Sequence, residues 1–447
     1  MQATRIAALF GALAGSALAQ WMAGAAEGKI TPPLGTRMAG FAARKGAAEA
    51  VHDDLFVRAL VVSRGKSAVA LVTVEVIGVD KGTVSRIRDE ASRRTAIPAE
   101  HIAISATHTH SGPEVRGSYT DFLIDTSADT IARAWQSRRP ARIGTDSIVH
   151  RGWVGMNRRH LESGFNPVDK SISILKLCDA QGRLEAVLYN YSCHPACLGP
   201  DNLQISADWP YFARRCIQGK LGGQVKVLFF QGTEGNVNTG YSAGLSAIGV
   251  PIATRNFPYA EEAGEVLADA ILARLPAIKT ETDGALDARD ERVELERYVP
   301  STVQEAEAQV EQARAALKRL EDQHAPEVRI QEARVQASFA EYNRSRVQRN
   351  LAAPRQYAAE IQAFRIGNAG LVTFPGEFFV EIGLEVRRRS PFRTTFCLGL
   401  ANDGIGYVPI PEAYTEGGYE PSVAQFGPTT AERWERAAER LLLDLSR

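Results

Sequence analysis

Two histidines separated by one residue lie in the segment 107–113, directly after an apolar run that ends at Ala106. His108 and His110 stand where this run, typical of a buried strand, gives way to a Gly-Pro turn. Side chains two residues apart in an extended chain point to the same side. Both imidazoles can therefore serve one reactive centre. The segment predicts the rim of an active site.

A third histidine, His194, lies between Cys193 and Cys197 and precedes a proline. Proline holds the residue before it in an extended conformation, which suits a metal ligand. A structural zinc knuckle would need a second Cys/His cluster, and the sequence offers none. The five cysteines are also too few and too irregular for a disulfide framework, so small buried hydrophobes are the favoured interpretation. By itself, His194 fits a hydrogen-bonded structural histidine as well as a ligand.

A carboxylate among aromatic residues gives the third signal. Glu377 follows a predicted strand at 370–373 and stands in a Pro-Gly-Glu-Phe-Phe turn. Burial of a carboxylate is costly unless it is paired or binds a metal. Two histidines and one glutamate form the ligand set of a catalytic zinc site with an open position for water. A glutamate in such a turn is about as often a helix cap or a surface residue.

Composition limits the function classes. The chain has 447 residues, of which 45% are apolar and 23% charged, close to soluble globular averages. Lys+Arg and Asp+Glu both number 52, so the formal net charge is zero. No broad field recruits nucleic acid or an anionic membrane. A small amphiphilic substrate is the expected partner, and peripheral membrane contact stays open.

The first 19 residues have the pattern of a signal peptide. Arg5 provides a basic start, residues 6–16 an apolar stretch, and residues 17–19 a small-x-small cleavage site. The apolar stretch is shorter than the roughly 20 residues that span a bilayer, and no transmembrane segment is expected elsewhere. We expect a secreted or periplasmic protein with one catalytic domain at 20–447. Translation from Met22 would instead leave a cytoplasmic enzyme.

Short β-rich runs alternate with helical stretches along the chain. This alternation predicts an α/β fold with a mixed β-sheet core flanked by helices. The motifs fall at strand ends, where α/β sheets place their ligands. The predicted strands are 55–62, 68–76, 102–106, 171–177, 186–191 and 225–231, and the predicted helices are 82–94, 118–136, 209–220, 259–275 and 430–443.

The segment 302–351 has a different pattern. It contains no glycine, and apolar residues from Val303 to Leu320 recur at alternating steps of three and four. The pattern resumes at Ile330 after Pro326, which suits the start of a second helix. We predict an antiparallel helical hairpin inserted into the domain. It could act as a lid or dimerisation arm, or be a solvated structural appendage.

Together these segments resemble the neutral/alkaline (non-lysosomal) ceramidases. The resemblance covers nearly all of the chain after residue 19, and its double-histidine motif is the most specific part. The motifs occur in the family's order: Ile-Thr-Pro-Pro-Leu-Gly at 30–35, Thr-His-Thr-His-Ser-Gly-Pro at 107–113, Cys-His-Pro at 193–195, Pro-Gly-Glu-Phe at 375–378 and Gly-Tyr-Val at 406–408.

The resemblance implies one zinc ion per chain and hydrolysis of the N-acyl amide of ceramide-type sphingolipids to fatty acid and sphingoid base. Zinc in such a site activates water and polarises the amide carbonyl. The protein ligands implied for the metal are His108, His194, Glu377 and Tyr407.

Three further residues are implied at the reacting amide. His110 would take the proton of the attacking water and return it to the departing amine. Arg158, in an Asn-Arg segment, and Tyr419, twelve residues beyond Tyr407, correspond to groups that contact the substrate's amide. As hydrogen-bond donors they would stabilise the tetrahedral oxyanion.

The chain departs from the family in two places. The family's Gly-Asp-x-Ser-Pro-Asn segment is replaced at 235–240, where Asn238 occupies the serine position. A serine nucleophile is therefore excluded, which favours direct attack by activated water or a different substrate. We also expect no C-terminal β-sandwich after the helix at 430–443. The alternatives are a zinc hydrolase of another amide or ester, and an inactive zinc-bearing binding protein.

Overall fold

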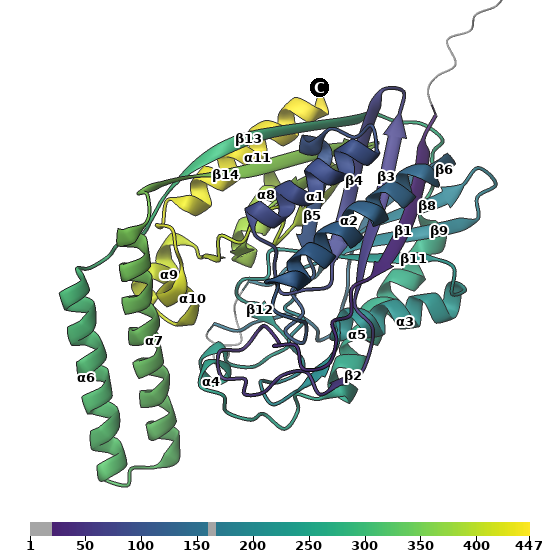
Figure 1. Ribbon diagram of the computed structural model, residues 1–447. Helices are drawn as coiled ribbons and strands as arrows, with labels where there is room; N and C mark the ends of the chain where they lie inside the picture. Colours follow the sequence, from purple (N-terminus) through teal and green to yellow (C-terminus); the bar gives the residue numbers. More distant parts are fainter. Residues whose placement is uncertain (1–19, 160–166) are drawn as a thin grey trace, which may run out of the picture.

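Two β-sheets pack face to face in this protein (Figure 1). The computed structural model describes residues 20–159 and 167–447, so the predicted signal peptide at 1–19 lies outside the described residues. The larger sheet has the order β11 (Lys226–Gln231), β9 (Leu184–Tyr191), β8 (Ser171–Asp179), β6 (Arg139–Val149), β1 (Met22–Lys29), β3 (Phe56–Arg64), β4 (Ser67–Val74) and β5 (Ile102–Ala106). The smaller has the order β13 (Leu286–Glu296), β14 (Gln356–Ile366), β15 (Ala369–Thr373) and β17 (Thr394–Leu398).

Both sheets are mixed, which confirms the predicted fold class. The pairs β4–β5, β9–β11 and β15–β17 are parallel, and the remaining neighbours are antiparallel. Apolar side chains from the two sheets meet between them, as Leu71 and Leu188 do with Phe364 and Phe396. Burial on both faces explains why β3, β4 and β5 are nearly continuous apolar runs.

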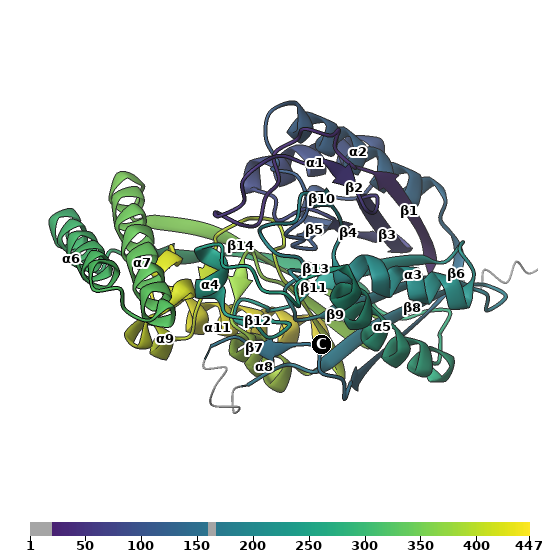
Figure 2. The same cartoon turned by 90° about the horizontal axis from the view of Figure 1, so that it is seen from below.

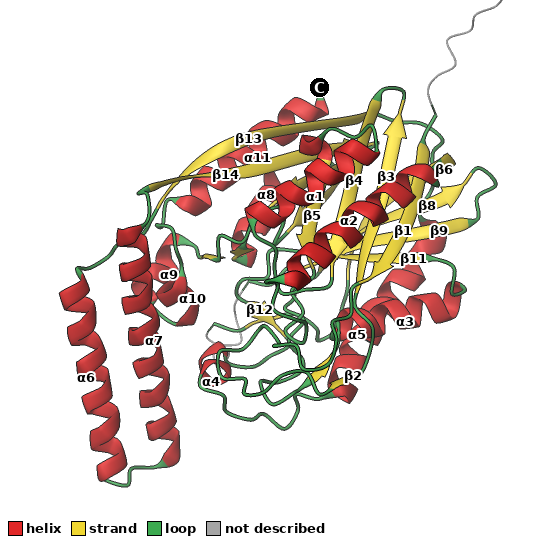
Figure 3. Cartoon of the chain, viewed as in Figure 1, coloured by secondary structure: helices red, strands yellow, loops and turns green. Residues whose placement is uncertain are grey.

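Helices cover the outer faces of the sheets (Figure 3). Helices α1 (Lys81–Arg94) and α2 (Ser118–Gln136) cover the β1–β3–β4–β5 half of the larger sheet. Helices α3 (Trp209–Leu221) and α5 (Phe257–Arg274) cover its other half, and α8 (Val380–Arg389) and α11 (Thr430–Ser446) cover the smaller sheet. None of the described helices combines the length and apolar character needed to cross a membrane.

The predicted hairpin is present. Helices α6 (Val303–Asp322) and α7 (Glu327–Ala352) run antiparallel between β13 and β14 and stand to one side of the sheets (Figures 1 and 2). Thr302 and Glu305 form a reciprocal capping box at the start of α6. Helix α7 packs on the short helices α4 (Ala243–Ala247) and α10 (Tyr419–Val423). The base of the hairpin is therefore part of the protein body.

The carboxyl ends of five strands meet at one edge, where backbone hydrogen bonds join the two sheets. Within the larger sheet, the amide of Gly232, after β11, donates to Tyr191 O at 2.9 Å; between the sheets, that of Gly399, after β17, donates to Gln231 O at 2.8 Å. The amide of Ala106, at the end of β5, donates to Leu400 O at 3.1 Å. The chain segments leaving β5, β9, β11, β15 and β17 therefore start close together.

Arg387 of α8 connects the two sheets beneath this edge. Its guanidinium donates to Ser173 Oγ at 2.8 Å, to Thr395 O at 2.6 Å and to Asn190 Oδ1 at 3.0 Å. It also forms an ion pair at 3.1 Å with Asp169, whose side chain is 1% exposed. Arg387 thus compensates a buried negative charge and ties β8, β9 and β17 together.

We predict that R387M lowers the free energy of unfolding by about 3–5 kcal/mol, because it leaves Asp169 as an unpaired buried charge. The control is R388M, since Arg388 is exposed and pairs only at the surface with Glu385; its cost should stay below about 1 kcal/mol. Urea unfolding of both variants measures the difference. Equal stability of the two variants would contradict the role assigned to Arg387.

Candidate metal centre and active site

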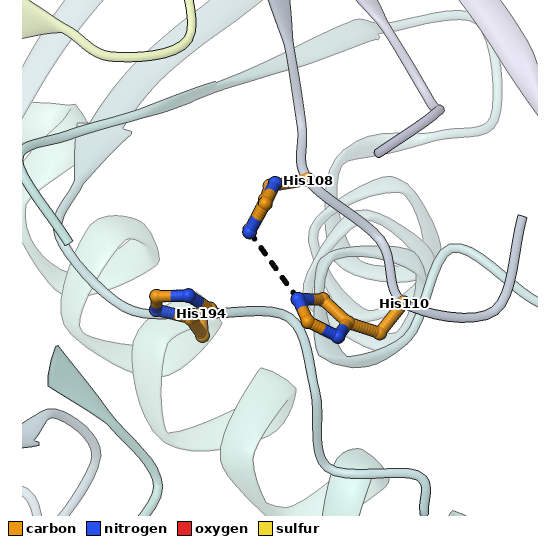
Figure 4. A group of neighbouring side chains, drawn as sticks. All are labelled: His108, His110 and His194. Atoms are coloured by element: carbon orange, nitrogen blue, oxygen red, sulfur yellow. Dashed lines mark hydrogen bonds between the residues drawn. The ribbon is translucent and has the colours of Figure 1, made fainter. Parts of the chain in front are cut away.

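The imidazoles of His108 and His110 face one another after β5. Their Nε2 atoms are 3.2 Å apart (Figure 4). The prediction that an extended strand points both side chains to the same side is wrong, because β5 ends at Ala106 and His108 has φ 70°. The left-handed backbone at His108, rather than strand alternation, turns its side chain toward His110. His108 Nδ1 lies 2.6 Å from Ile77 O, so it donates to this carbonyl, and the Nε2 lone pair accepts from His110 Nε2.

His194 follows the end of β9 and is fully buried. Its Nδ1 lies 3.0 Å from Glu234 O and 2.9 Å from Val237 O. Carbonyl oxygens only accept, so Nδ1 carries the proton and Nε2 keeps its lone pair. His108 and His194 therefore share an arrangement that is usual for metal-binding histidines. Their rings lie with that of His110 around one point (Figure 4).

Glu377 joins the two histidines. Its Oε2 lies 3.3 Å from His108 Nε2 and 3.2 Å from His194 Nε2. Glu377 starts β16 (Glu377–Phe378), which pairs in parallel with β18 (Tyr407–Val408) and sets Tyr407 directly opposite Glu377. The residues expected to bind a metal are thus brought together.

Glu234 is a fourth chemical group that the sequence reasoning missed. Its carboxylate belongs with His108, His194 and Glu377 to a group whose donor atoms all lie within 4.8 Å of one another. Burial, together with the negative charge of Glu377, raises the pKa of Glu234 well above its usual range. Its position after β11, at a strand end like those of the histidines, was the available signal.

Arg158 lies beside the same group, next to β7 (Met156–Asn157). Its Nη2 donates to Tyr407 Oη at 3.1 Å and to Gly235 O at 2.8 Å, and its Nε donates to Glu420 Oε1 at 2.7 Å. Burial by itself lowers the pKa of Arg158, but Tyr407 and Glu420 outweigh it and raise this pKa. Arg158 is therefore a permanent cation that orients Tyr407. Glu420 is a second partner that sequence reasoning did not identify.

Tyr419 completes the wall of the site. Its ring centroid lies 5.6 Å from that of Tyr407 and 6.0 Å from that of Tyr342 on α7. A cavity of about 50 Å³ is lined by His110, Arg158, Tyr407 and Tyr419, among others. Burial raises the pKa of Tyr419, so its hydroxyl is a hydrogen-bond donor at neutral pH. The catalytic candidates therefore share one cavity.

Asn238, at the family's serine position, lines this cavity from β12 (Val237–Asn238). Its Nδ2 donates to Tyr241 O at 2.8 Å, and its Oδ1 accepts from the amide of Gly240 at 2.7 Å. The side chain stabilises a turn and offers no nucleophilic oxygen. Acyl transfer to this position is therefore excluded.

Comparison with known proteins places this arrangement in a recognised fold. No family model matches the chain. The neutral ceramidase from Pseudomonas aeruginosa matches with a TM-score of 0.74 at 19% identity, over 96% of this chain and 74% of that one. A structure described as a ceramidase complexed with C2 matches with a TM-score of 0.73 at 18% identity, over 96% and 75% of the two chains. This protein has the neutral ceramidase fold. The resemblance seen in the motifs is thus confirmed at the level of the fold.

Within this ceramidase fold, the donor set fits a divalent cation. Two imidazoles present unprotonated Nε2 atoms, and Glu377 faces both at 3.2–3.3 Å. Glu234 adds a carboxylate with no hydrogen-bond partner elsewhere among the described residues. A cation would compensate both buried carboxylates. Mixed nitrogen and oxygen ligands accept zinc and several other divalent ions.

We predict that H108A and H194A each weaken zinc binding by more than about 100-fold, because loss of a direct ligand costs more than the 10–100-fold typical of an outer-shell partner. The control H101Q should bind zinc normally, since His101 lies directly before β5, at the opposite end of that strand from His108, with Nδ1 on Ala68 O. Competition with a chromophoric chelator measures the affinities. Normal zinc binding by H194A would contradict this assignment.

Proposed function

We propose that this protein is a zinc-dependent amidohydrolase that cleaves the N-acyl amide of ceramide-type sphingolipids. The observation that carries the proposal is the convergence of His108, His194 and Glu377, with Tyr407 opposite Glu377, inside a ceramidase fold. Zinc held by these four residues would activate water near neutral pH and polarise the substrate carbonyl. We also propose that the protein is exported, as the predicted signal peptide at 1–19 implies.

His110 acts as the general base and acid in this proposal. Its Nδ1 is buried and has no hydrogen-bond partner among the described residues, whereas the Nδ1 atoms of His108 and His194 bond to backbone carbonyls. A histidine that binds a metal almost always has such a partner. This difference supports ligand roles for His108 and His194 and a proton-transfer role for His110.

Arg158 and Tyr419 act on the reacting amide. Both line the cavity that contains His110. Tyr419 donates a hydrogen bond to the developing oxyanion, while Arg158 holds Tyr407 and adds positive charge. Loss of one such donor commonly costs about 3–4 kcal/mol of transition-state stabilisation. Because Asn238 offers no nucleophile, water attacks the carbonyl directly.

The neighbouring cavity supports an amphiphilic substrate. It has a volume of about 310 Å³, shares Arg158 and Tyr419 with the smaller one, and is lined by Val335 and Phe339 of α7. These two apolar side chains belong to a lining that also contains Arg159, Glu416 and Glu420. In this proposal, the acyl or sphingoid chain of a lipid amide extends along Val335 and Phe339 toward the hairpin. A dimerisation role of the hairpin stays a prediction.

We predict that the purified protein releases fatty acid from a short-chain ceramide, that a chelator abolishes the reaction, and that added zinc restores it, because zinc supplies the electrophile and the activated water. Fatty-acid release measures the activity. An N-acyl amino acid serves as the comparison substrate. Cleavage of that substrate alone would retain the hydrolase and reject ceramide. Inactivity on both with zinc bound would favour a binding protein.

We predict that H110A lowers kcat by about 100-fold or more, as expected for loss of a general acid and base, while zinc occupancy stays near that of the wild type. Turnover and metal content are measured on the same preparation. H194A is the matched comparison, since it should lose both. Full turnover by H110A would reject the role of His110, and loss of zinc would make His110 a ligand.

A different amide or ester as substrate is the second candidate. The cavity next to His110 measures only about 50 Å³, and Asn238 replaces the family's serine. Both features favour a change in the group that is accepted beside the scissile bond. The catalytic residues would keep the same roles, so the comparison substrate above separates the two candidates.

A further inference from the structure

The segment from Gln231 to Asn238 wraps around His194. Its backbone holds the histidine, because Glu234 O and Val237 O both accept from His194 Nδ1. The amide of Val237 donates to Glu234 O at 2.6 Å, which closes a tight turn at this point. The backbone of Glu234 is therefore anchored to a proposed metal ligand. Its side chain starts next to the centre.

A negative charge on the Glu234 carboxylate would need compensation at this buried position. The residue is 0% exposed, and neither carboxylate oxygen has a hydrogen-bond partner on another described residue. Burial of an unpaired carboxylate is strongly unfavourable. The nearby Arg158 does not hydrogen-bond to it, because its guanidinium donates to Glu420, Gly235 O and Tyr407. The described residues therefore give this carboxylate no direct partner.

Two nearby carboxylates differ from that of Glu234 because they have protein partners. Glu381 of α8 accepts from Asn236 Nδ2 at 2.9 and 3.2 Å, and Glu420 is paired with Arg158 at 2.7 Å. Both are satisfied by the protein. Glu234 instead shares a 4.8 Å group with His108, His194 and Glu377. Its environment is that of a ligand and not of a structural ion pair.

Gly399 provides room for this side chain. A Cβ at position 399 would lie 3.2 Å from Glu234 Oε2 and would overlap Gly232 O at 1.9 Å. The segments that follow β11 and β17 therefore approach closely at the point where the carboxylate enters the centre. The turn and the facing glycine together direct Glu234 inward.

We propose that Glu234 is a further protein ligand of the metal, so that the centre has two imidazoles and two carboxylates beside Tyr407. This inference rests on the metal site of the proposed function. The two carboxylates together balance the charge of a divalent cation. Such a set is richer in oxygen than the four ligands that the family resemblance implies, and Glu234 directly precedes the segment 235–240 where this chain departs from the family.

The test is zinc binding by chelator-treated E234Q, which removes the charge and keeps the shape. A chromophoric chelator competes for the ion, and the rise in Tm on zinc addition is a second readout. We expect E234Q to bind zinc at least tenfold more weakly and to show a smaller rise in Tm. The matched control is E381Q, which changes a buried glutamate outside the 4.8 Å group and should bind zinc as the wild type does.

Folding is checked by comparing the metal-free forms. If Glu234 only supported the fold, E234Q without metal would melt below the metal-free wild type; a ligand role predicts an equal or higher Tm. Should E234Q fail to fold, E234D keeps the charge on a shorter side chain, and intermediate zinc affinity is expected. Unchanged zinc affinity in E234Q or E234D would overturn the inference and leave the amidohydrolase proposal intact. Weakened zinc binding by E234Q, together with no ceramide cleavage by the wild type, would support the inference and reject the amidohydrolase proposal.

Discussion

The backbone hydrogen bonds that join the strand ends of the two sheets are the interaction on which the site depends. The amide of Gly399 on Gln231 O and that of Ala106 on Leu400 O connect the smaller sheet to both halves of the larger one. The segments that leave these strands therefore cannot separate. They carry His108, His194, Glu234 and Glu377, which come from four distant parts of the chain. Sheet packing supplies the precision that these short loops lack.

The arrangement also gathers carboxylates and imidazoles at one point, where they can bind a cation. The buried carboxylates of Glu234 and Glu377 destabilise one another when uncompensated, and only a close-packed scaffold holds them together. Paired groups surround the centre: Arg158 with Glu420 on one side, and Glu381 with Asn236 on another. Arg158 also donates a hydrogen bond to Tyr407, so the first of these pairs orients a side chain of the centre. Glu234 stands apart because it has no partner of this kind in the part of the chain that the structure describes.

The helical hairpin adds a second level of organisation. It is inserted between two long antiparallel strands, β13 and β14, so its base is held by the smaller sheet. Helix α7 then brings Phe339 and Tyr342 against Tyr419 at the cavity. The hairpin thus lines the cavity that also contains His110 and Tyr419. Its contribution follows from where it is inserted.

The sequence by itself determined the elements with clear local patterns and the histidine motifs at their ends. Helix α2 and strand β5 have the predicted bounds, because apolar periodicity and flanking turn residues define them locally. Strand β13 was missed because it is rich in charged residues and gains its order from β14. The tertiary structure alone decided the left-handed turn at His108, the burial of Glu234 and the pairing of Arg158 with Glu420. Each of these depends on contacts between residues far apart in the chain, which no local pattern encodes.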